Sequence, residues 1–272
     1  MADRSRNPEY NMSHKHRGIA LIFNNEHFED PHLKLRKGTH KDSENLGRAL
    51  KQLGFQVKEY TDLCSEPIMK IIKEASGRDH SDCDCILIAI LSHGKLNYIH
   101  AKDKAYPVES ILSPFTAERC PSLAGKPKLF IIQACQGVLR DPGCHINRPE
   151  SSERDNESFI SYRIPLPADF LIASSTIPGY CSWRNTVEGS WFIQSLCKEL
   201  DSFGKTRDVL TQMTFVAQRV AVNYESFDEF NPRLDGRKQI SSTMSTLTRI
   251  LFFRDKNDTS NDDTSNDYFK NK

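Results

Sequence analysis

Four short runs of almost uninterrupted apolar residues constrain the fold of this 272-residue chain more than any other feature. They cover residues 19–23, 85–91, 129–132 and 170–173. A strand has this pattern when both faces of its sheet are covered, which is typical of parallel sheets. Even the longest run falls well short of the roughly 20 apolar residues that a membrane-spanning helix needs.

Segments with helical spacing lie between and after these runs. Thr39-x-x-Asp42 predicts a helix start, and Leu46, Leu50 and Leu53 follow it as an apolar stripe. Similar patterns predict helices over residues 65–77, 191–204 and from Thr206 to about 220, and residues 245–253 predict a last strand. Strands that alternate with amphipathic helices predict a single α/β domain, a three-layer α/β/α sandwich around a mostly parallel sheet.

Charge and cysteine content narrow the classes of function. The 37 Lys and Arg against 36 Asp and Glu leave a net charge of +1, which argues against a nucleic-acid or anionic-membrane partner. The eight cysteines are irregularly spaced and the first residues lack the apolar stretch of a signal peptide, so we expect reduced thiols and a cytoplasmic location. There is no G-x-G-x-x-G and no P-loop motif to indicate a nucleotide.

Chemically active side chains follow the apolar runs. In open parallel sheets, ligands bind beyond the carboxyl ends of the strands. His93 follows the second run, Gln133 and Cys135 follow the third, and Arg184 lies in the loop after the fourth. Arg36 lies in the loop after the first run. We therefore expect these five residues to converge on one edge of the sheet.

Cys135 has an ordinary alternative role, because a cysteine near an apolar strand is usually a small core residue. It lies, however, just past the apolar stretch and next to Gln136-Gly137, where a thiol is accessible. A second alternative is a metal site at His80, Cys83 and Cys85, but no second ligand pair with zinc-finger spacing accompanies them. We therefore expect no metal and no cofactor.

The flanking sequences are more specific. The segment QACQG, from Gln133 to Gly137, fits the pattern QAC[RQG]G with a histidine about 50 residues upstream, which is the caspase signature. SHG at residues 92–94, YNMSHKHRGIALIFNNEHF at 10–28 and YCSWRNTVEGSWFIQSLC at 180–197 match in the same order. Over residues 10–253 the chain resembles caspases of the executioner (effector) subgroup, and insect effector caspases in particular.

This resemblance implies a cysteine endopeptidase that cuts proteins after aspartate and executes programmed cell death. Cys135 would be its nucleophile and His93 the general base. The backbone N–H groups of Gly94 and Cys135 would stabilise the oxyanion, and each such donor typically raises the reaction rate about 10²–10³-fold. A backbone carbonyl near Lys34 would orient the imidazole.

The resemblance also implies the substrate pockets. Arg36, Gln133 and Arg184 match the aspartate pocket, where two guanidinium groups and an amide surround a carboxylate. Filling such a pocket with an uncharged side chain would strand buried cations, at a cost of roughly 3–5 kcal/mol. Trp183 would be the wall of the second pocket, and Cys181 stands where an aromatic residue is usual, so this pocket is expected to be wider.

The region for the fourth residue back from the cut matches less evenly. Asn185, Trp191 and Phe227 correspond to it, although Trp191 is equally well explained as helix core. The segment around Phe227, residues 225–239, departs from the family pattern.

The resemblance divides the chain into five parts. These are a short N-terminal peptide (1–15), a large-subunit region (16–137), an intersubunit linker (138–162), a small-subunit region (163–254) and a tail (255–272). The tail carries DTSND twice and is expected to be disordered. The N-terminal peptide is too short for a recruitment domain, so we expect an effector that acts downstream of an initiator protease.

In the family, the zymogen is activated by a cut in the linker. Asp141 and Asp155 are the candidates, and Pro142 disfavours the first, so we expect the cut after Asp155. Residues 239–253 resemble the segment that pairs two copies, which predicts a homodimer, and inhibitor-of-apoptosis proteins are further expected partners. The alternative function is a catalytically weak or silent homologue that acts as a regulatory binding partner; the presence of His93, Cys135 and both arginines argues against it.

Overall fold

A six-stranded sheet forms the centre of the molecule in the computed structural model, which describes residues 7–143, 168–229 and 231–256. Its strands are β1 (Ile19–Asn24), β2 (Gln56–Thr61), β3 (Ile86–Leu91), β7 (Lys128–Gln133), β9 (Phe170–Ser174) and β13 (Ser242–Ser245). Their order is β13-β9-β7-β3-β1-β2. All neighbours pair in parallel except β13, which is antiparallel to β9. The mostly parallel sheet predicted from the apolar runs is confirmed.

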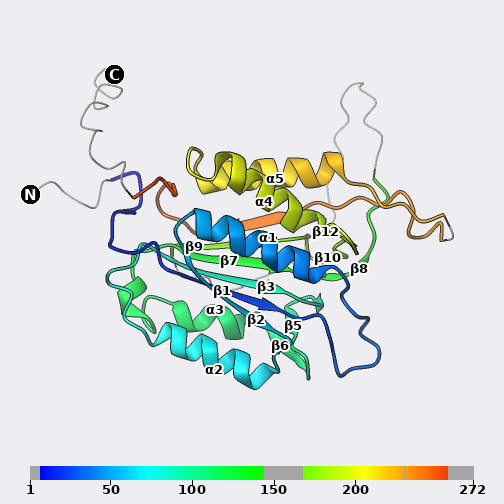
Figure 1. Cartoon of the computed structure of the whole chain (residues 1–272), viewed down its shortest axis with the longest axis horizontal. Coiled ribbons are helices and arrows are strands. Elements are labelled where there is room, and N and C mark those ends of the chain that lie inside the picture. Colours follow the sequence, from blue (N-terminus) through cyan, green and yellow to red (C-terminus); the bar gives the residue numbers. More distant parts are fainter. Residues whose placement is uncertain (1–6, 144–167, 230, 257–272) are drawn as a thin grey trace, which may run out of the picture.

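Helices cover both faces of this sheet (Figure 1). On one face lie α1 (Thr39–Gln52), α4 (Trp191–Phe203) and α5 (Val209–Asn223), and on the other lie α2 (Ser65–Ser76) and α3 (Glu109–Leu112). Two 3₁₀ turns, η2 (Ser113–Phe115) and η3 (Pro121–Leu123), follow α3. The predicted α/β/α sandwich is thereby confirmed.

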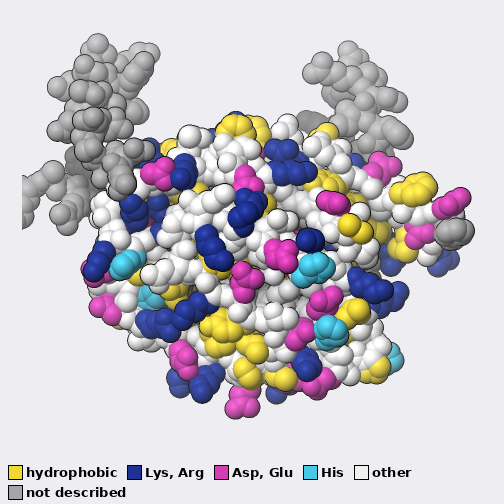
Figure 2. Space-filling view, in the orientation of Figure 1, with side chains coloured by type: hydrophobic (Ala, Val, Ile, Leu, Met, Phe, Trp, Pro, Cys, Tyr) yellow, Lys and Arg dark blue, Asp and Glu magenta, His cyan; other side chains and the backbone are white. Residues whose placement is uncertain are grey.

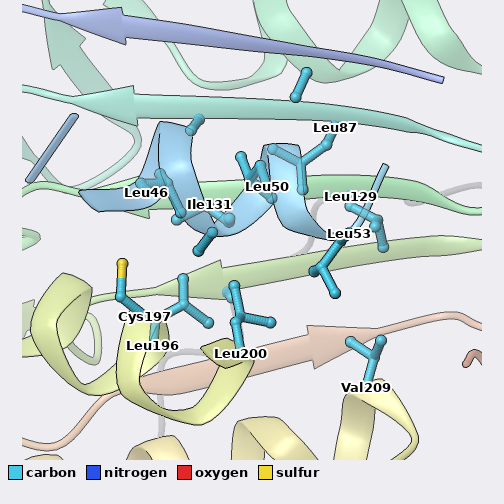
Figure 3. Close-up of a cluster of buried hydrophobic side chains, with 14 of the residues drawn as sticks. Leu46, Leu50, Leu53, Leu87, Leu129, Ile131, Leu196, Cys197, Leu200 and Val209 are labelled. Atoms are coloured by element: carbon cyan, nitrogen blue, oxygen red, sulfur yellow. The ribbon is translucent and has the colours of Figure 1, made fainter. Parts of the chain in front are cut away.

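The core is split between the two faces because successive side chains of a strand point in opposite directions. In β3, Leu87 and Leu91 pack toward α1 and α4, whereas Ile88 and Ile90 pack toward α2. Figure 3 shows the first of these clusters, in which leucines of α1 and α4 meet those of the sheet. All six residues of β3 are buried, which explains its continuous apolar sequence.

Short strands extend the structure at the carboxyl end of the sheet. β4 (Gly94–Lys95), β5 (Tyr98–His100) and β6 (Ala105–Pro107) form one small sheet. β8 (Gly137–Leu139) pairs with β10 (Gly179–Tyr180), and β11 (Arg184–Asn185) pairs with β12 (Gly189–Ser190). The labels β8, β10 and β12 lie together at one end of the sheet in Figure 1.

Three sequence-based element assignments need correction. The sequence analysis missed β2, an edge strand whose residues are exposed or half-buried and which therefore lacks an apolar run. Helix α5 begins at Val209 and is capped by the Asp208 carboxylate, which accepts the Thr211 N–H at 3.0 Å, so Thr206 is not its cap. The last strand, β13, ends at Ser245; Leu251 and Phe253 are buried as core residues without strand pairing.

The loosely held segments are shorter than expected. Tyr10 of the N-terminal peptide is 5% exposed, and its hydroxyl donates to Asp169 Oδ1 at 2.6 Å. At the start of the expected linker, Val138 and Leu139 belong to β8. At the start of the expected tail, the Lys256 ammonium contacts the buried Asp84. The rest of the linker, with Asp155, and the remainder of the tail lie outside the described residues.

The surface carries both signs of charge. Figure 2 shows Lys and Arg side chains interspersed with Asp and Glu on this face, as the near-zero net charge suggests. Within the described ranges, no helix is both long and apolar enough to cross a membrane.

Candidate active site

The sheet register brings the predicted residues to one edge. Asn24, Leu91 and Gln133 are partners at the ends of β1, β3 and β7. His93 and Cys135 each follow two residues beyond their strand ends. Parallel strands that end in register place the segments following them side by side, so a histidine and a cysteine far apart in the sequence become neighbours.

His93 is oriented by the loop after β1. Its Nε2 lies 2.6 Å from the backbone carbonyl of Lys34, and its ring packs against Phe28 with 4.9 Å between ring centres. A carbonyl can only accept, so Nε2 carries the proton and Nδ1 is left as the basic atom. Burial, followed by the charges of Arg36 and Arg184, lowers the pKa of His93 to about 4, so the ring is neutral at neutral pH.

Cys135 lies in surroundings that favour its thiolate. The Cys181 thiol donates a hydrogen bond to its sulfur, and the Ser182 N–H does so at 3.3 Å. With the nearby charges of Arg36 and Arg184, these bonds outweigh burial and lower the pKa of the Cys135 thiol to about 6. A lowered pKa of this kind is characteristic of reactive cysteines.

The backbone around Cys135 offers a place for an oxyanion. The neighbouring backbone N–H groups already donate hydrogen bonds, that of Ala134 to Ser175 Oγ and that of Gln136 to the Tyr180 carbonyl. The N–H of Cys135 itself has no acceptor among the described residues. Gly94 lies against this segment so closely that a Cβ there would come 2.8 Å from the Cys135 carbonyl oxygen, and only glycine fits.

Arg36 is a buried cation with spare hydrogen-bonding capacity. It is 1% exposed, and its Nη1 donates to the Asn25 carbonyl at 2.8 Å and to Thr39 Oγ1 at 2.7 Å. Its Nη2 has no partner among the described residues. Burial, together with the charge of Arg184, lowers the pKa of Arg36 to about 9. An unpaired buried guanidinium is costly, and an anion would relieve that cost.

Gln133 and Arg184 have the same character. Gln133 is 2% exposed; its Nε2 donates to Ser182 Oγ at 2.7 Å, and its Oε1 has no partner among the described residues. Arg184 is half-buried, and its Nε donates to the Lys37 carbonyl at 2.9 Å. Burial lowers the pKa of this group too. The bond to Lys37 links the loop of Arg36 to the hairpin of Arg184.

Asp42, expected from sequence only as part of a helix start, fixes that hairpin. It is 1% exposed, and its carboxylate accepts the Ser190 N–H at 2.7 Å and the Ser190 hydroxyl at 2.5 Å. Ser190 belongs to β12, the partner strand of Arg184, so helix α1 holds the hairpin in place. With both of its oxygens bound to Ser190, Asp42 leaves the guanidinium groups of Arg36 and Arg184 free to bind another anion.

The residues expected in the outer pockets divide into two groups. Trp183 and Trp191 stack with 5.8 Å between ring centres, and Trp191 stacks in turn on Tyr224. The Asn185 side chain stabilises its own turn, because its Oδ1 accepts hydrogen bonds from the backbone N–H groups of Val187 and Glu188. Phe227 is 84% exposed and shares no ring contact with either tryptophan in the described part of the chain.

Two other contributors escaped the sequence analysis. Ser182 bonds to both Cys135 and Gln133, and Gln239 accepts the Trp183 N–H at 2.6 Å while donating to the Ser175 carbonyl at 2.7 Å. These are ordinary polar residues with no distinguishing pattern in the sequence. Only their place at the strand ends reveals them.

A polarised thiol, a neutral imidazole, a buried guanidinium and a half-buried one at one sheet edge define a cysteine hydrolase suited to an acidic substrate. The family model for the caspase domain matches residues 17–252. Caspase drICE of Drosophila melanogaster is 57% identical over 91% of the chain and 73% of its own length, and Caspase-1 of Spodoptera frugiperda is 52% identical over 92% and 82%. The crystal structure of the Spodoptera protein has a TM-score of 0.86 at 50% identity, covering 95% of this chain and 98% of that one.

The chain belongs to the caspase family. Together with its similarity to insect effector caspases, this makes it an aspartate-specific cysteine endopeptidase of apoptosis.

Proposed function

We propose that Cys135 is the nucleophile of this endopeptidase, that His93 is its general base and acid, and that Arg36, Gln133 and Arg184 bind the substrate aspartate. The observation that carries the proposal is the orphaned Nη2 of Arg36, buried next to a second guanidinium. A carboxylate is the group that both satisfies this donor and offsets the repulsion between the two charges.

The reaction follows from the protonation states. Nδ1 of His93 takes up the proton that leaves the Cys135 thiol, and the Cys135 sulfur attacks the carbonyl carbon. The resulting oxyanion accepts hydrogen bonds from the N–H groups of Cys135 and Gly94. His93 gives a proton to the departing amine as the C–N bond breaks, leaving a thioester on Cys135. His93 then takes a proton from water, which attacks the thioester and releases the new carboxyl terminus.

The aspartate pocket also acts on the proton chemistry. Arg36 and Arg184 both lower the pKa of His93, so the ring holds a proton poorly in the empty site. A bound carboxylate neutralises part of this charge and raises the pKa of His93. Aspartate binding therefore prepares the general acid, in addition to holding the substrate.

The outer pockets are proposed on weaker contacts. Trp183, stacked on Trp191, provides a rigid aromatic wall for the second pocket, with Cys181 leaving extra room. Asn185, Trp191 and Phe227 would contact the fourth residue back, and the exposure of Phe227 leaves its ring free to do so.

We further propose a cytosolic zymogen that an initiator protease cuts after Asp155, giving a large part and a small part. The edge position of β13 supports pairing with a second copy, because an open edge strand is otherwise exposed to uncontrolled association. Protein substrates with an exposed aspartate and inhibitor-of-apoptosis proteins are the expected partners.

Matched fluorogenic tetrapeptides that end in aspartate, asparagine or glutamate test the pocket. We expect kcat/KM for asparagine to fall by about 10²–10³, because the neutral amide leaves the guanidinium groups unpaired. Equal rates on aspartate and asparagine would refute the pocket. No turnover of any peptide after the linker cut would favour the silent, regulatory homologue.

A further inference from the structure

A second cysteine, Cys181, is held beside the nucleophile by the pairing of β8 with β10. Gly137 pairs with Gly179, and the Gln136 N–H donates to the Tyr180 carbonyl at 3.0 Å. The Cys181 N–H donates to the Leu139 carbonyl at 2.8 Å. The backbone on both sides of Cys181 is therefore fixed against the segment that follows Cys135.

The two thiols are neighbours. The Cys181 thiol donates to the Gly137 carbonyl oxygen at 3.5 Å, and its interaction with the Cys135 sulfur lowers the pKa of Cys135. The next residue along, Ser182, closes the contact through its N–H, 3.3 Å from the Cys135 sulfur. Among the described cysteines, no other pair shares a thiol–thiol hydrogen bond, and Cys85, Cys120 and Cys197 are buried.

We propose that Cys135 and Cys181 form a reversible disulfide in the presence of hydrogen peroxide, which inactivates the enzyme until a small thiol reduces it. The proposal rests on the role of Cys135 as nucleophile. The sequence position of Cys181, in the small-subunit region, means that the bond also joins the two parts of the cut chain.

The chemistry balances in two steps. The Cys135 thiolate attacks one oxygen of hydrogen peroxide, the O–O bond breaks, and sulfenic acid and hydroxide form. The Cys181 sulfur then attacks the sulfenic sulfur, the S–O bond breaks, and the Cys181 proton leaves with the hydroxyl as water. Two thiols are oxidised and one peroxide is reduced to two waters. A small thiol reverses the product by thiol–disulfide exchange.

Each cysteine suits its step. Cys135 is the more acidic thiol, because it receives two hydrogen bonds and lies near two arginines, so it reacts first with peroxide. The interaction with the Cys135 sulfur, followed by burial, raises the pKa of Cys181, so that thiol stays protonated until the sulfenic acid forms. Both side chains are half-exposed, which leaves a path for peroxide and for the reductant.

The disulfide also protects the nucleophile. A sulfenic acid with no thiol partner is oxidised further to sulfinic acid, which small thiols do not reduce. A partner already in contact competes with that second oxidation. Cys181 would thus both widen the second pocket and keep the oxidation of Cys135 reversible.

The test treats three full-length proteins with hydrogen peroxide: the unmodified chain, Cys181→Ser, and Cys64→Ser as a matched control at a cysteine outside the site. Remaining thiols are blocked with iodoacetamide, and the protein is digested without reduction for mass spectrometry. We expect a peptide pair joined through Cys135 and Cys181 in the first and third proteins. Cys181→Ser should instead carry two added oxygens on Cys135.

Activity, relative to each protein's own untreated rate, is the second readout. We expect about a tenfold loss that dithiothreitol reverses in the unmodified chain and in Cys64→Ser, and the same loss without recovery in Cys181→Ser. Peroxide treatment that gives no joined peptide pair, or full recovery of Cys181→Ser, would overturn the proposal. The peptide pair reports on the disulfide even if peptide cleavage fails, so the two proposals are tested separately.

Discussion

Two guanidinium groups contribute to the electrostatics of the site at the scale of single residues. Burial lowers the pKa of His93 and the Cys181 thiol lowers that of Cys135, and the charges of Arg36 and Arg184 lower both further, which favours a thiolate next to a neutral imidazole. The nearby carboxylates Asp42 and Glu26 act on both charges only through space, and both oxygens of Asp42 are bound to Ser190. Substrate recognition and activation of the nucleophile therefore depend on one cluster of charge.

Removal of either arginine should abolish recognition while sparing the nucleophile. For Arg36→Ala and Arg184→Ala we expect kcat/KM on an aspartyl peptide to fall by about 10²–10⁴, the equivalent of losing one partner of a buried ion pair. Cys135 should still be alkylated by iodoacetamide at a pH well above its pKa, which shows an intact site. Arg119→Ala, an exposed arginine, is the control. Normal cleavage by either pocket variant would contradict the assignment.

The pH dependence of Cys135 alkylation tests the role of Cys181. The thiolate is the reactive form, so alkylation should be fast above the pKa of about 6 and slow as the pH falls below it. Cys181→Ala removes the thiol that contributes most to the lowered pKa of Cys135, so the midpoint should move to higher pH. Cys181→Ser keeps a donor and should stay near the unmodified chain. The measurement is the rate of iodoacetamide labelling at Cys135, and identical midpoints in all three would contradict this account.

At the scale of elements, a loop and a hairpin carry the two arginines and brace one another. The loop reaches the hairpin through the Lys37 carbonyl and through Gly38, whose φ of 83° and closeness to the hairpin suit only glycine. A Cβ on Gly38 would lie 2.5 Å from the Thr186 carbonyl oxygen. Displacement of the hairpin would move Arg184.

Gly38→Ala should therefore impair both stability and activity. We expect a loss of about 3 kcal/mol or more in the free energy of unfolding, since backbone strain and the clash add together, and a fall in kcat/KM. Gly125→Ala is the matched control: its φ is 71°, but no atom lies within 4 Å of the added Cβ. It should cost only about 1–2 kcal/mol and leave kcat/KM unchanged. Urea unfolding and peptide cleavage measure both, and equal effects of the two variants would contradict the bracing.

The elements differ in how well the sequence predicts them. β3 and β7 are buried on both faces, and helix α1 has one apolar stripe, so hydrophobic pattern alone finds them. β2 is an edge strand with little burial, and the apolar end of residues 246–253 reflects Leu251 and Phe253, which are buried in the core without strand pairing. The hydrophobic pattern of a sequence reports which residues are buried, not which backbone groups pair in a sheet. It therefore fails to predict a strand where burial and pairing do not coincide.

At the scale of the whole molecule, the proposed intersubunit linker lies between the part of the chain with Cys135 and the part with Arg184 and Cys181. Leu139 and the Cys181 backbone are joined by β8 and β10, so the two parts already meet at the nucleophile before any cut. A cut farther along the linker can change the mobility of the loops without separating these parts.

The activating cut is predicted after Asp155. N-terminal sequencing of the small fragment should begin with Asn156, and Asp155→Ala should remain a single chain with little activity. Asp141→Ala should be cut as usual, because Pro142 disfavours cleavage there and Asp141 is held by pairing with Lys238. A small fragment that begins at another residue, or full activity of the uncut chain, would contradict this prediction.

Part of the candidate site is predictable from sequence because its residues follow strand ends, which apolar runs mark. Cys135 and His93 illustrate this, each two residues beyond its strand, whereas the Lys34 carbonyl was expected only from the family resemblance. Asp42 and Ser182 were not accessible, since their importance comes from contacts between segments distant in the sequence. The thiol contact of Cys181 belongs to the same group.

The most direct test of the account is cleavage of a fluorogenic aspartyl tetrapeptide by the cut protein and by Cys135→Ala prepared with the same linker cut. The substitution removes only a sulfur at a strand end, so the variant should keep its circular dichroism spectrum and unfolding midpoint. We predict that cleavage falls to the background rate in Cys135→Ala while the unmodified protein turns the peptide over. Residual turnover by a folded Cys135→Ala would contradict the assignment of Cys135 as the nucleophile.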